Sequence, residues 1–179
     1  AVIAQSQDIN LLCGDKVSSL HTDSQGANIT LSSGAKLAGK LVVAADSRFS
    51  ESRRAIGIGA DMNDFGKTML VCCMTHEEPH HHAAWEWFDY GQTLALLPMN
   101  GLKSSVVITL PPREISSLIC MPEADFNHEI SERFKHRLGA MRLASTRHAY
   151  PLVTVFAKRL INQRFALVGD AAVGMHPVT

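Results

Sequence analysis

The sequence predicts a mixed fold of the α+β and α/β classes, in which a domain with parallel strands contains an inserted domain built on an antiparallel sheet. Two observations lead to this prediction. The short apolar segments 41–45 and 165–168 are typical of strands buried on both faces of a parallel sheet, and each is followed by an aspartate. Between them lie consecutive strand-like segments joined by short turns, which is typical of antiparallel sheets. The predicted domain segments are therefore 1–60, 61–160 and 161–179, with the first and last in one domain.

The first sixty residues are predicted to contain a helix end, a small meander and one buried strand. Residues 1–12 are expected to end a helix that closes at Gly14. The segments 17–22 and 27–32 flank an Asp-Ser-Gln-Gly turn, which predicts a hairpin. A second turn at Gly34 leads into the buried strand.

The middle of the chain is predicted to form an antiparallel sheet with one helix. Four strand-like segments are separated by short joints, at 66–75, 83–90, 92–99 and 104–110. Residues 122–138 are predicted to be helical, because apolar residues recur every four positions and Gly139 follows. An extended segment over 149–160 then leads into the last buried strand.

The composition excludes several functional classes. Hydrophobic residues make up 46% of the 179-residue chain, enough for a buried core, and 17 basic residues balance 17 acidic ones. This balance gives no sign of nucleic-acid binding. The apolar runs are far shorter than the roughly 20 residues that span a bilayer, and no signal peptide is visible. The four cysteines form no C-x-x-C pair, which predicts free thiols and a cytoplasmic location: Cys13, Cys72, Cys73 and Cys120.

Two aspartate-containing turns are the candidate ligand site. Asp46 ends one buried strand, and Arg53 follows on a short predicted helix. Gly169 and Asp170 end the other buried strand and open into a second predicted helix. Ligands of open α/β sheets bind at the carboxyl ends of strands, so both carboxylates are expected at one crevice. The alternative is that each aspartate only caps the following helix.

The two turns together resemble a known family. The stretch LVVAADSRFSESRRAIGI resembles the AD-G-x-x-S-x-x-R motif of the class A FAD-dependent aromatic hydroxylases, and RFALVGDAAVGMHPVT resembles their second flavin motif. The stretches WEWFDYGQTLALLPMN and AYPLVTVFAKRL resemble the branch that hydroxylates ubiquinone precursors. The resemblance covers essentially the whole chain. It implies a partial FAD-binding, Rossmann-like domain and an inserted antiparallel-sheet substrate domain.

The chain also departs from the family pattern. Ser47 stands where the first motif has glycine, and Val173 replaces a histidine of the second. The Gly57-Ile58-Gly59 stretch lacks the third glycine of a dinucleotide fingerprint, because Met62 stands there. We therefore expect the chain to be a fragment of a longer flavoprotein that lacks the glycine-rich N-terminal loop and the C-terminal part. The fragment alone is expected to be inactive and to bind FAD weakly.

The resemblance implies what the longer protein does. It implies an enzyme that binds FAD, is reduced by NAD(P)H, and uses oxygen to hydroxylate a hydrophobic phenol or quinol in ubiquinone biosynthesis. A reductase or halogenase on the same scaffold, and a non-catalytic β-rich binding module, are the alternatives. A peripheral membrane or multi-enzyme association, and the oligomeric state, stay open. The expected cofactor-binding residues are Asp46, Arg53, Gly169, Asp170, His176 and Pro177.

The substrate wall is expected on the aromatic strand of the inserted domain. Trp85 and Trp87 share one face of this strand and Phe88 lies on the other, so only one face can line a cavity. No Arg or Lys occurs between Lys67 and Lys103, which favours an apolar substrate over a charged one. Ordinary core packing is the alternative. The predicted wall residues are Trp85, Trp87, Phe88, Leu96 and Pro98.

Neither a catalytic residue nor a metal site is predicted. No acid–base pair stands out in the sequence. His76 and the run 80–82 lack the ligand spacing of a zinc site, and adjacent histidines on an extended chain point apart.

Overall fold

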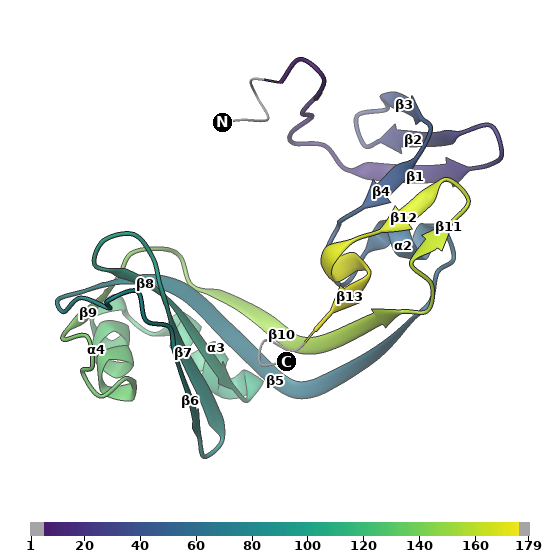
Figure 1. Ribbon diagram of the computed structural model, residues 1–179. Helices are drawn as coiled ribbons and strands as arrows, with labels where there is room; N and C mark the ends of the chain where they lie inside the picture. Colours follow the sequence, from purple (N-terminus) through teal and green to yellow (C-terminus); the bar gives the residue numbers. More distant parts are fainter. Residues whose placement is uncertain (1–5, 176–179) are drawn as a thin grey trace. The chain divides into compact units, whose positions relative to one another are not determined.

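Strands dominate the regular structure, as the sequence predicts. The computed structural model describes residues 6–175 (Figure 1). The chain divides into unit 1, formed by Ala1–Asn63 and Val153–Thr179, and unit 2, formed by Asp64–Leu152. Unit 2 is therefore continuous in sequence, while unit 1 is assembled from the two segments that flank it.

Unit 1 contains two small sheets. The first is an antiparallel meander in the order β1-β2-β3, built from β1 (Val17–Thr22), β2 (Ala27–Leu31) and β3 (Lys36–Gly39). The second has the order β11-β12-β4, built from β11 (Ile161–Asn162), β12 (Phe165–Leu167) and β4 (Val42–Ala44). The pair β12–β4 is parallel, which confirms the prediction that the two buried strands lie in one sheet.

Short elements complete unit 1. The helix α2 (Glu51–Ala55) follows β4, and the 3-10 helix η1 (Gly169–Ala171) and β13 (Val173–Gly174) follow β12. The core of this unit is formed by Ala44, Ile58, Phe165, Leu167, Ala171 and Ala172.

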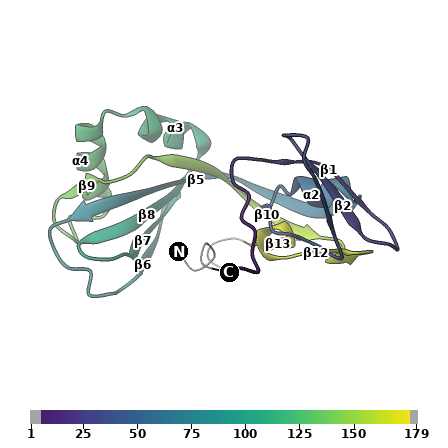
Figure 2. The same ribbon diagram turned by 90° about the horizontal axis from the view of Figure 1, so that it is seen from above.

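Unit 2 is built on an antiparallel sheet with two helices on one face. Strands β5, β8, β7 and β6 pair in that order, and β9 pairs with β5. Figure 2 shows α3 and α4 on the same side of this sheet. The bounds are β5 (Ala60–His76), β6 (Trp85–Asp89), β7 (Gln92–Pro98), β8 (Lys103–Leu110), α3 (Pro112–Cys120), α4 (Glu123–Arg133), β9 (Met141–Leu143) and β10 (His148–Ala157). β5 begins, and β10 ends, in unit 1.

The core of unit 2 lies between the sheet and its helices. Every second residue of β8 is buried, and in β7 the buried Leu94 and Leu96 alternate with less buried neighbours, as expected for strands with one covered face. The helices contribute Ile115 and Leu118 from α3, and Phe126 and Ile130 from α4. No helix among residues 6–175 is long and apolar enough to cross a membrane.

Three predicted helices differ from the structure. Residues 6–12 are not helical, and residues 1–5 lie outside the described part. The helix predicted over 122–138 ends at Arg133, because Lys135 and His136 take left-handed backbone angles of 52° and 49°. The helix predicted after Asp170 is a single 3-10 turn followed by β13.

Candidate functional site

The two aspartate turns follow the carboxyl ends of the two parallel strands, at the same end of the sheet. Leu167 lies opposite Ala44 in the register of β12 and β4, so Asp46 and Asp170 follow neighbouring strands. This arrangement confirms the neighbouring strand ends predicted from the sequence. Open α/β sheets bind ligands at the carboxyl ends of their strands, where both aspartates lie.

Asp46 organises the turn that leads into α2. Its Oδ1 accepts a hydrogen bond from the Ser50 hydroxyl at 2.6 Å, and its Oδ2 accepts one from the Ser52 N–H at 2.9 Å. Ser50 is the N-cap of α2, and its Oγ accepts a hydrogen bond from the Arg53 N–H. Partial burial raises the pKa of Asp46, but the hydrogen bonds outweigh it, and the pKa lies below its ordinary value. Asp46 is therefore an ionised carboxylate with both oxygens engaged.

Arg48 links the two turns. Its Nη2 donates to Asp170 Oδ2 at 2.9 Å, and its Nη1 donates to the Val153 carbonyl at 2.9 Å. A Cβ at Gly174 would lie 3.0 Å from Arg48 Cβ, so this glycine lets the arginine stem pass. Arg48 was absent from the predicted site. Its position two residues after Asp46, in the first motif, was the signal that could have indicated it.

Arg53 forms a second link but leaves a donor unused. Its side chain is only 3% exposed, and its Nη1 donates to the Ala171 carbonyl at 2.8 Å. Among residues 6–175, no group accepts a hydrogen bond from its buried Nε. A buried cation with an unsatisfied N–H is costly, which makes Arg53 the side chain of this site that most needs a ligand.

Asp46 also borders a cavity in unit 1. The cavity has a volume of about 660 Å³, within the range typical of small-molecule sites. It lies between β1 and α2, with Lys16, Leu20, Phe49 and Ser52 among its lining residues. Its carboxylate, hydroxyl and apolar groups suit a molecule with both hydroxyl and apolar parts.

The backbone of both turns explains their small residues. The φ angles of Gly169 (56°) and Ser47 (73°) both lie in the left-handed region that favours glycine. This explains why glycine stands at the position of Ser47 in the motif that the sequence resembles. The predicted residues His176 and Pro177 lie outside the described residues.

Replacing Ser47 by glycine is expected to stabilise the chain. A non-glycine residue with a left-handed backbone costs about 1–2 kcal/mol, part of which glycine loses again in the unfolded chain. We expect Ser47→Gly to raise the free energy of unfolding in urea by about 1 kcal/mol. The control Ser116→Gly, inside α3, should lower it by about 0.5–1 kcal/mol. A Ser47→Gly chain less stable than the parent would show that the serine side chain is needed.

In unit 2, the predicted wall residues fall on two faces of the sheet. Cross-strand register places Trp85 opposite Leu96 and Trp87 opposite Leu94, and Pro98 lies on the same face. This face is covered by the helices: Leu96 is fully buried, and the Trp87 ring contacts the Phe134 ring at 5.5 Å. Four of the five predicted wall residues therefore pack toward the core of unit 2.

The other face of the sheet is not covered by α3 or α4. Phe88, which is 71% exposed, is the predicted wall residue on this face. Leu97, 44% exposed, lies there too, because it neighbours Leu96 on β7 and points the opposite way. Cross-strand pairing places three further apolar residues side by side on this face, all partly buried: Val71, Ala95 and Val107. We call this face the open face.

An arginine from a distant segment reaches the aromatic strand. The Arg137 guanidinium lies 4.7 Å from the Trp85 ring centre and 5.6 Å from that of Trp87. The sequence has no Arg or Lys between Lys67 and Lys103, and no local pattern predicted this contact. Only tertiary structure brings the segment after α4 to β6.

The histidines hold a loop in place. His76 Nε2 bonds to Ser104 Oγ at 3.0 Å, and His80 Nε2 donates to the Met99 carbonyl at 2.9 Å. Burial lowers the pKa of His76, in keeping with a neutral ring. Within residues 6–175, no group of three or more His, Cys, Asp or Glu side chains could hold a metal ion. These histidines therefore fasten the connection between β5 and β6.

Comparisons with known proteins show which proteins this chain is similar to. No protein-family model matches the chain. The chain is 43% identical over 178 residues to ubiquinone hydroxylase UbiM of Neisseria meningitidis, an alignment that covers 99% of the chain and 39% of that protein. The chain thus spans about two-fifths of the length of this relative.

Solved structures show the same fold. PqsL, a probable FAD-dependent monooxygenase from Pseudomonas aeruginosa, is 19% identical with a TM-score of 0.74, over 98% of the chain and 51% of PqsL. The flavin-dependent halogenase CmlS is 16% identical with a TM-score of 0.77, over 98% of the chain and 34% of CmlS. Sequence and fold together confirm the predicted resemblance: the chain aligns with one segment of a ubiquinone hydroxylase and shares the fold of a probable FAD-dependent monooxygenase and of a flavin-dependent halogenase.

Proposed function

We propose that this segment belongs to an FAD-dependent enzyme that hydroxylates a hydrophobic phenol or quinol in ubiquinone biosynthesis. The observation that carries the proposal is the 43% identity to a ubiquinone hydroxylase along 99% of the chain. The fold alone does not choose the reaction, because a flavin-dependent halogenase shares it. Halogenation of the same kind of ring is therefore the second candidate.

The residues that follow the carboxyl ends of β4 and β12 fit a flavin dinucleotide. The buried Nε of Arg53 offers an unused donor for a phosphate or carbonyl oxygen. Asp170 is half exposed and shares only Oδ2 with Arg48, which leaves Oδ1 to accept a ribose hydroxyl. Gly169 has no heavy atom within 4 Å of the place where a Cβ would stand, so backbone can approach a ligand there.

Each residue has a proposed part. Asp46 keeps α2 in place through Ser50 and Ser52, while Arg53, Gly169 and Asp170 contact FAD. When bound, FAD supplies the transfer of one oxygen atom to the ring. His176 and Pro177 are proposed to bind the cofactor as well, as the resemblance implies. We assign no general acid or base in this chain.

The open face is proposed as the substrate wall. Its apolar residues suit a hydrophobic ring or side chain better than a charged acid. Phe88 and Leu97 would contact the substrate, while Trp85, Trp87, Leu96 and Pro98 would support the sheet from the covered face. This assignment keeps the predicted Phe88, adds Leu97, and chooses between the two faces that the sequence left open.

Further features of the function are proposed on the resemblance. NAD(P)H is the proposed reductant and oxygen the co-substrate. The proposed location is the cytoplasm, with a peripheral association with the membrane or with other enzymes. We propose no nucleic-acid partner, because basic and acidic residues balance in the sequence.

The test is a product assay with the complete protein that contains this segment. The protein, loaded with FAD, would receive NADH or NADPH, oxygen, chloride and either a prenylated phenol or small aromatic carboxylates. We expect nicotinamide oxidation coupled to a product that is heavier by one oxygen atom, with the prenylated phenol preferred. A chlorinated product would support the halogenase instead. Turnover of the carboxylates alone would disprove the hydrophobic substrate but not the oxygenation.

A further inference from the structure

The tip of the β6–β7 hairpin presents aromatic side chains to solvent. Phe88 is largely exposed and Tyr90 fully so. The hairpin, seen in Figure 1, turns at Gly91, which has a φ of 77°. The Asp89 carboxylate accepts a hydrogen bond from the Tyr90 N–H at 2.7 Å, which holds the turn. The two rings are therefore displayed on a tight, ordered turn, so little conformational entropy is lost when they are covered.

Cationic side chains surround this tip. Lys67 Nζ donates to the Gly91 carbonyl at 3.3 Å, and Arg133 Nη1 donates to Gln92 Oε1 at 2.6 Å. Lys135 and Arg137 line a cavity of about 380 Å³ together with residues of the hairpin. The aromatic part of its wall is formed by Trp87, Phe88 and Phe134.

Arg137 is held in place without a carboxylate. Its guanidinium stacks on Trp85 and Trp87, an arrangement that fixes the plane of the group and leaves its N–H groups free to bind an anion. Among residues 6–175, no carboxylate lies within 4.0 Å of the charged groups of Lys67, Lys135 or Arg137.

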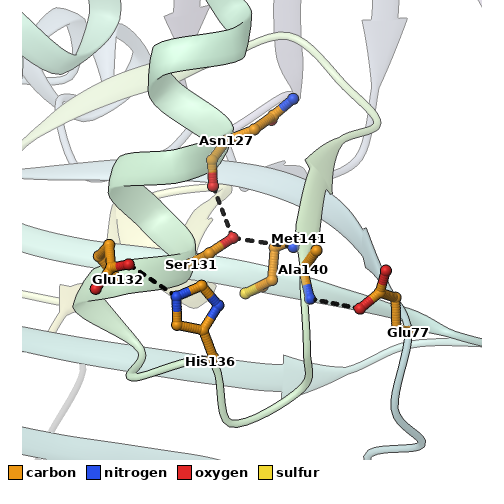
Figure 3. A network of polar contacts seen from close by, with 7 residues as sticks. All are labelled: Glu77, Asn127, Ser131, Glu132, His136, Ala140 and Met141. Carbon is orange, nitrogen blue, oxygen red and sulfur yellow. Dashed lines mark hydrogen bonds and ion pairs between the residues drawn. The ribbon is translucent and has the colours of Figure 1, made fainter.

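The segment that carries Lys135 and Arg137 is fastened at both ends, as Figure 3 shows. At its start, His136 Nε2 pairs with Glu132 Oε1 at 2.8 Å. At its end, the Ala140 N–H donates to Glu77 Oε2 at 2.9 Å, and the Met141 N–H donates to Ser131 Oγ at 3.0 Å. The cations are therefore presented by a structured turn.

Part of the positive charge at this tip is balanced by carboxylates. Asp89 lines the same cavity, and its pKa is lowered by the hydrogen bond from the Tyr90 N–H and also by the charge of Lys135. Glu129 pairs with Arg133, and Glu132 pairs with His136. Lys67 and Arg137 are the cations of this tip that remain without a carboxylate partner among residues 6–175, and they lie near the exposed rings of Phe88 and Tyr90. Tyrosine and cations side by side are typical of surfaces that lie at the membrane–water interface.

We propose that the β6–β7 tip docks on an anionic phospholipid membrane. A lipid phosphate enters the 380 Å³ cavity beside Lys135 and Arg137, and the ring of Tyr90 enters the headgroup layer. A free phosphate would explain the cations but leave Tyr90 without a role. The inference rests on the proposed peripheral association with the membrane and names the surface that makes it. Its test measures lipid binding and not hydroxylation, so its failure would leave the proposed reaction standing.

The test uses the two tryptophans of the 179-residue chain, both of which lie at this site. Vesicles of phosphatidylglycerol mixed with phosphatidylcholine, and of phosphatidylcholine alone, are titrated into the chain. Tryptophan emission and co-sedimentation are measured at low and high salt. We expect binding that needs phosphatidylglycerol, weakens with salt and shifts the emission.

Matched variants locate the surface. Lys135→Gln with Arg137→Gln should weaken binding by about 25-fold, at about fivefold for each cation. Tyr90→Ser should weaken it by about fivefold. The controls are Lys36→Gln with Lys40→Gln, and Tyr150→Ser at the other tyrosine of the chain, which should bind as the parent does. Thermal unfolding of each variant shows whether it is folded.

Three results would overturn the proposal. The first is the absence of binding to phosphatidylglycerol vesicles. The second is equal loss of binding in the tip variants and in the folded controls. The third is full competition by millimolar inorganic phosphate with no effect of Tyr90→Ser, which would indicate a soluble-anion site.

Discussion

Replacing Leu96 by alanine is expected to lower the free energy of unfolding of the chain by about 2–5 kcal/mol, because its fully buried side chain packs in the core of unit 2. The same change at the adjacent Leu97 should cost less than about 1 kcal/mol, since this side chain lies on the open face and is 44% exposed. Urea unfolding followed by circular dichroism measures both.

The pair also tests the proposed substrate wall. In the complete protein, Leu97→Ala should raise KM for a prenylated phenol, with little effect on KM for a smaller phenol. The wall assignment would be wrong if Leu97→Ala were as destabilising as Leu96→Ala, because Leu97 would then belong to a core. A KM unchanged for both phenols would likewise remove Leu97 from the substrate site.

Replacing Arg53 by methionine is expected to separate stability from cofactor binding. Methionine keeps most of the buried stem but removes the charge and the unsatisfied Nε, so the chain should unfold at a similar or higher urea concentration. In the complete protein, loss of a charge-assisted contact should weaken FAD binding by about 10- to 100-fold. Flavin fluorescence titration gives the Kd.

The control is the neighbouring residue. Arg54 is exposed on the same helix, and Arg54→Met should change neither the stability nor the Kd by more than about twofold. If Arg53→Met unfolded the chain without changing the Kd for FAD, the role of Arg53 would be the link to the Ala171 carbonyl alone.

Local patterns predicted the strands well because the alternation of apolar and polar residues along a strand shows which of its faces is buried. The alternation in β7 and β8, and the turns that separate them, are visible in the sequence. The helix α3 was missed because it begins at two prolines and buries only Ile115 and Leu118. The helix predicted over 1–12 is wrong for residues 6–12, which contain exposed apolar residues and no buried stripe.

The candidate site was predictable where sequence neighbours build it. Asp46, Ser50 and Arg53 lie within one turn and helix, and the motif indicates them together. The contacts of Arg48 with Asp170 and of Arg137 with Trp85 join residues far apart in the sequence, which no local pattern reveals. Alternation along β6 shows that two faces exist, but only the packing of the helices decides which one is covered.

The pairing of β4 with β12 has a consequence for the order of folding. Val42 pairs with Phe165, and all residues of unit 2 lie between these two in the sequence. The meander β1-β2-β3, by contrast, joins residues that are close in sequence. Closing so long an unfolded loop is entropically costly, and the cost falls once the intervening segment has become compact. Unit 2 should therefore fold before the parallel pair forms, and the turns of Asp46 and Asp170 should meet in the last step.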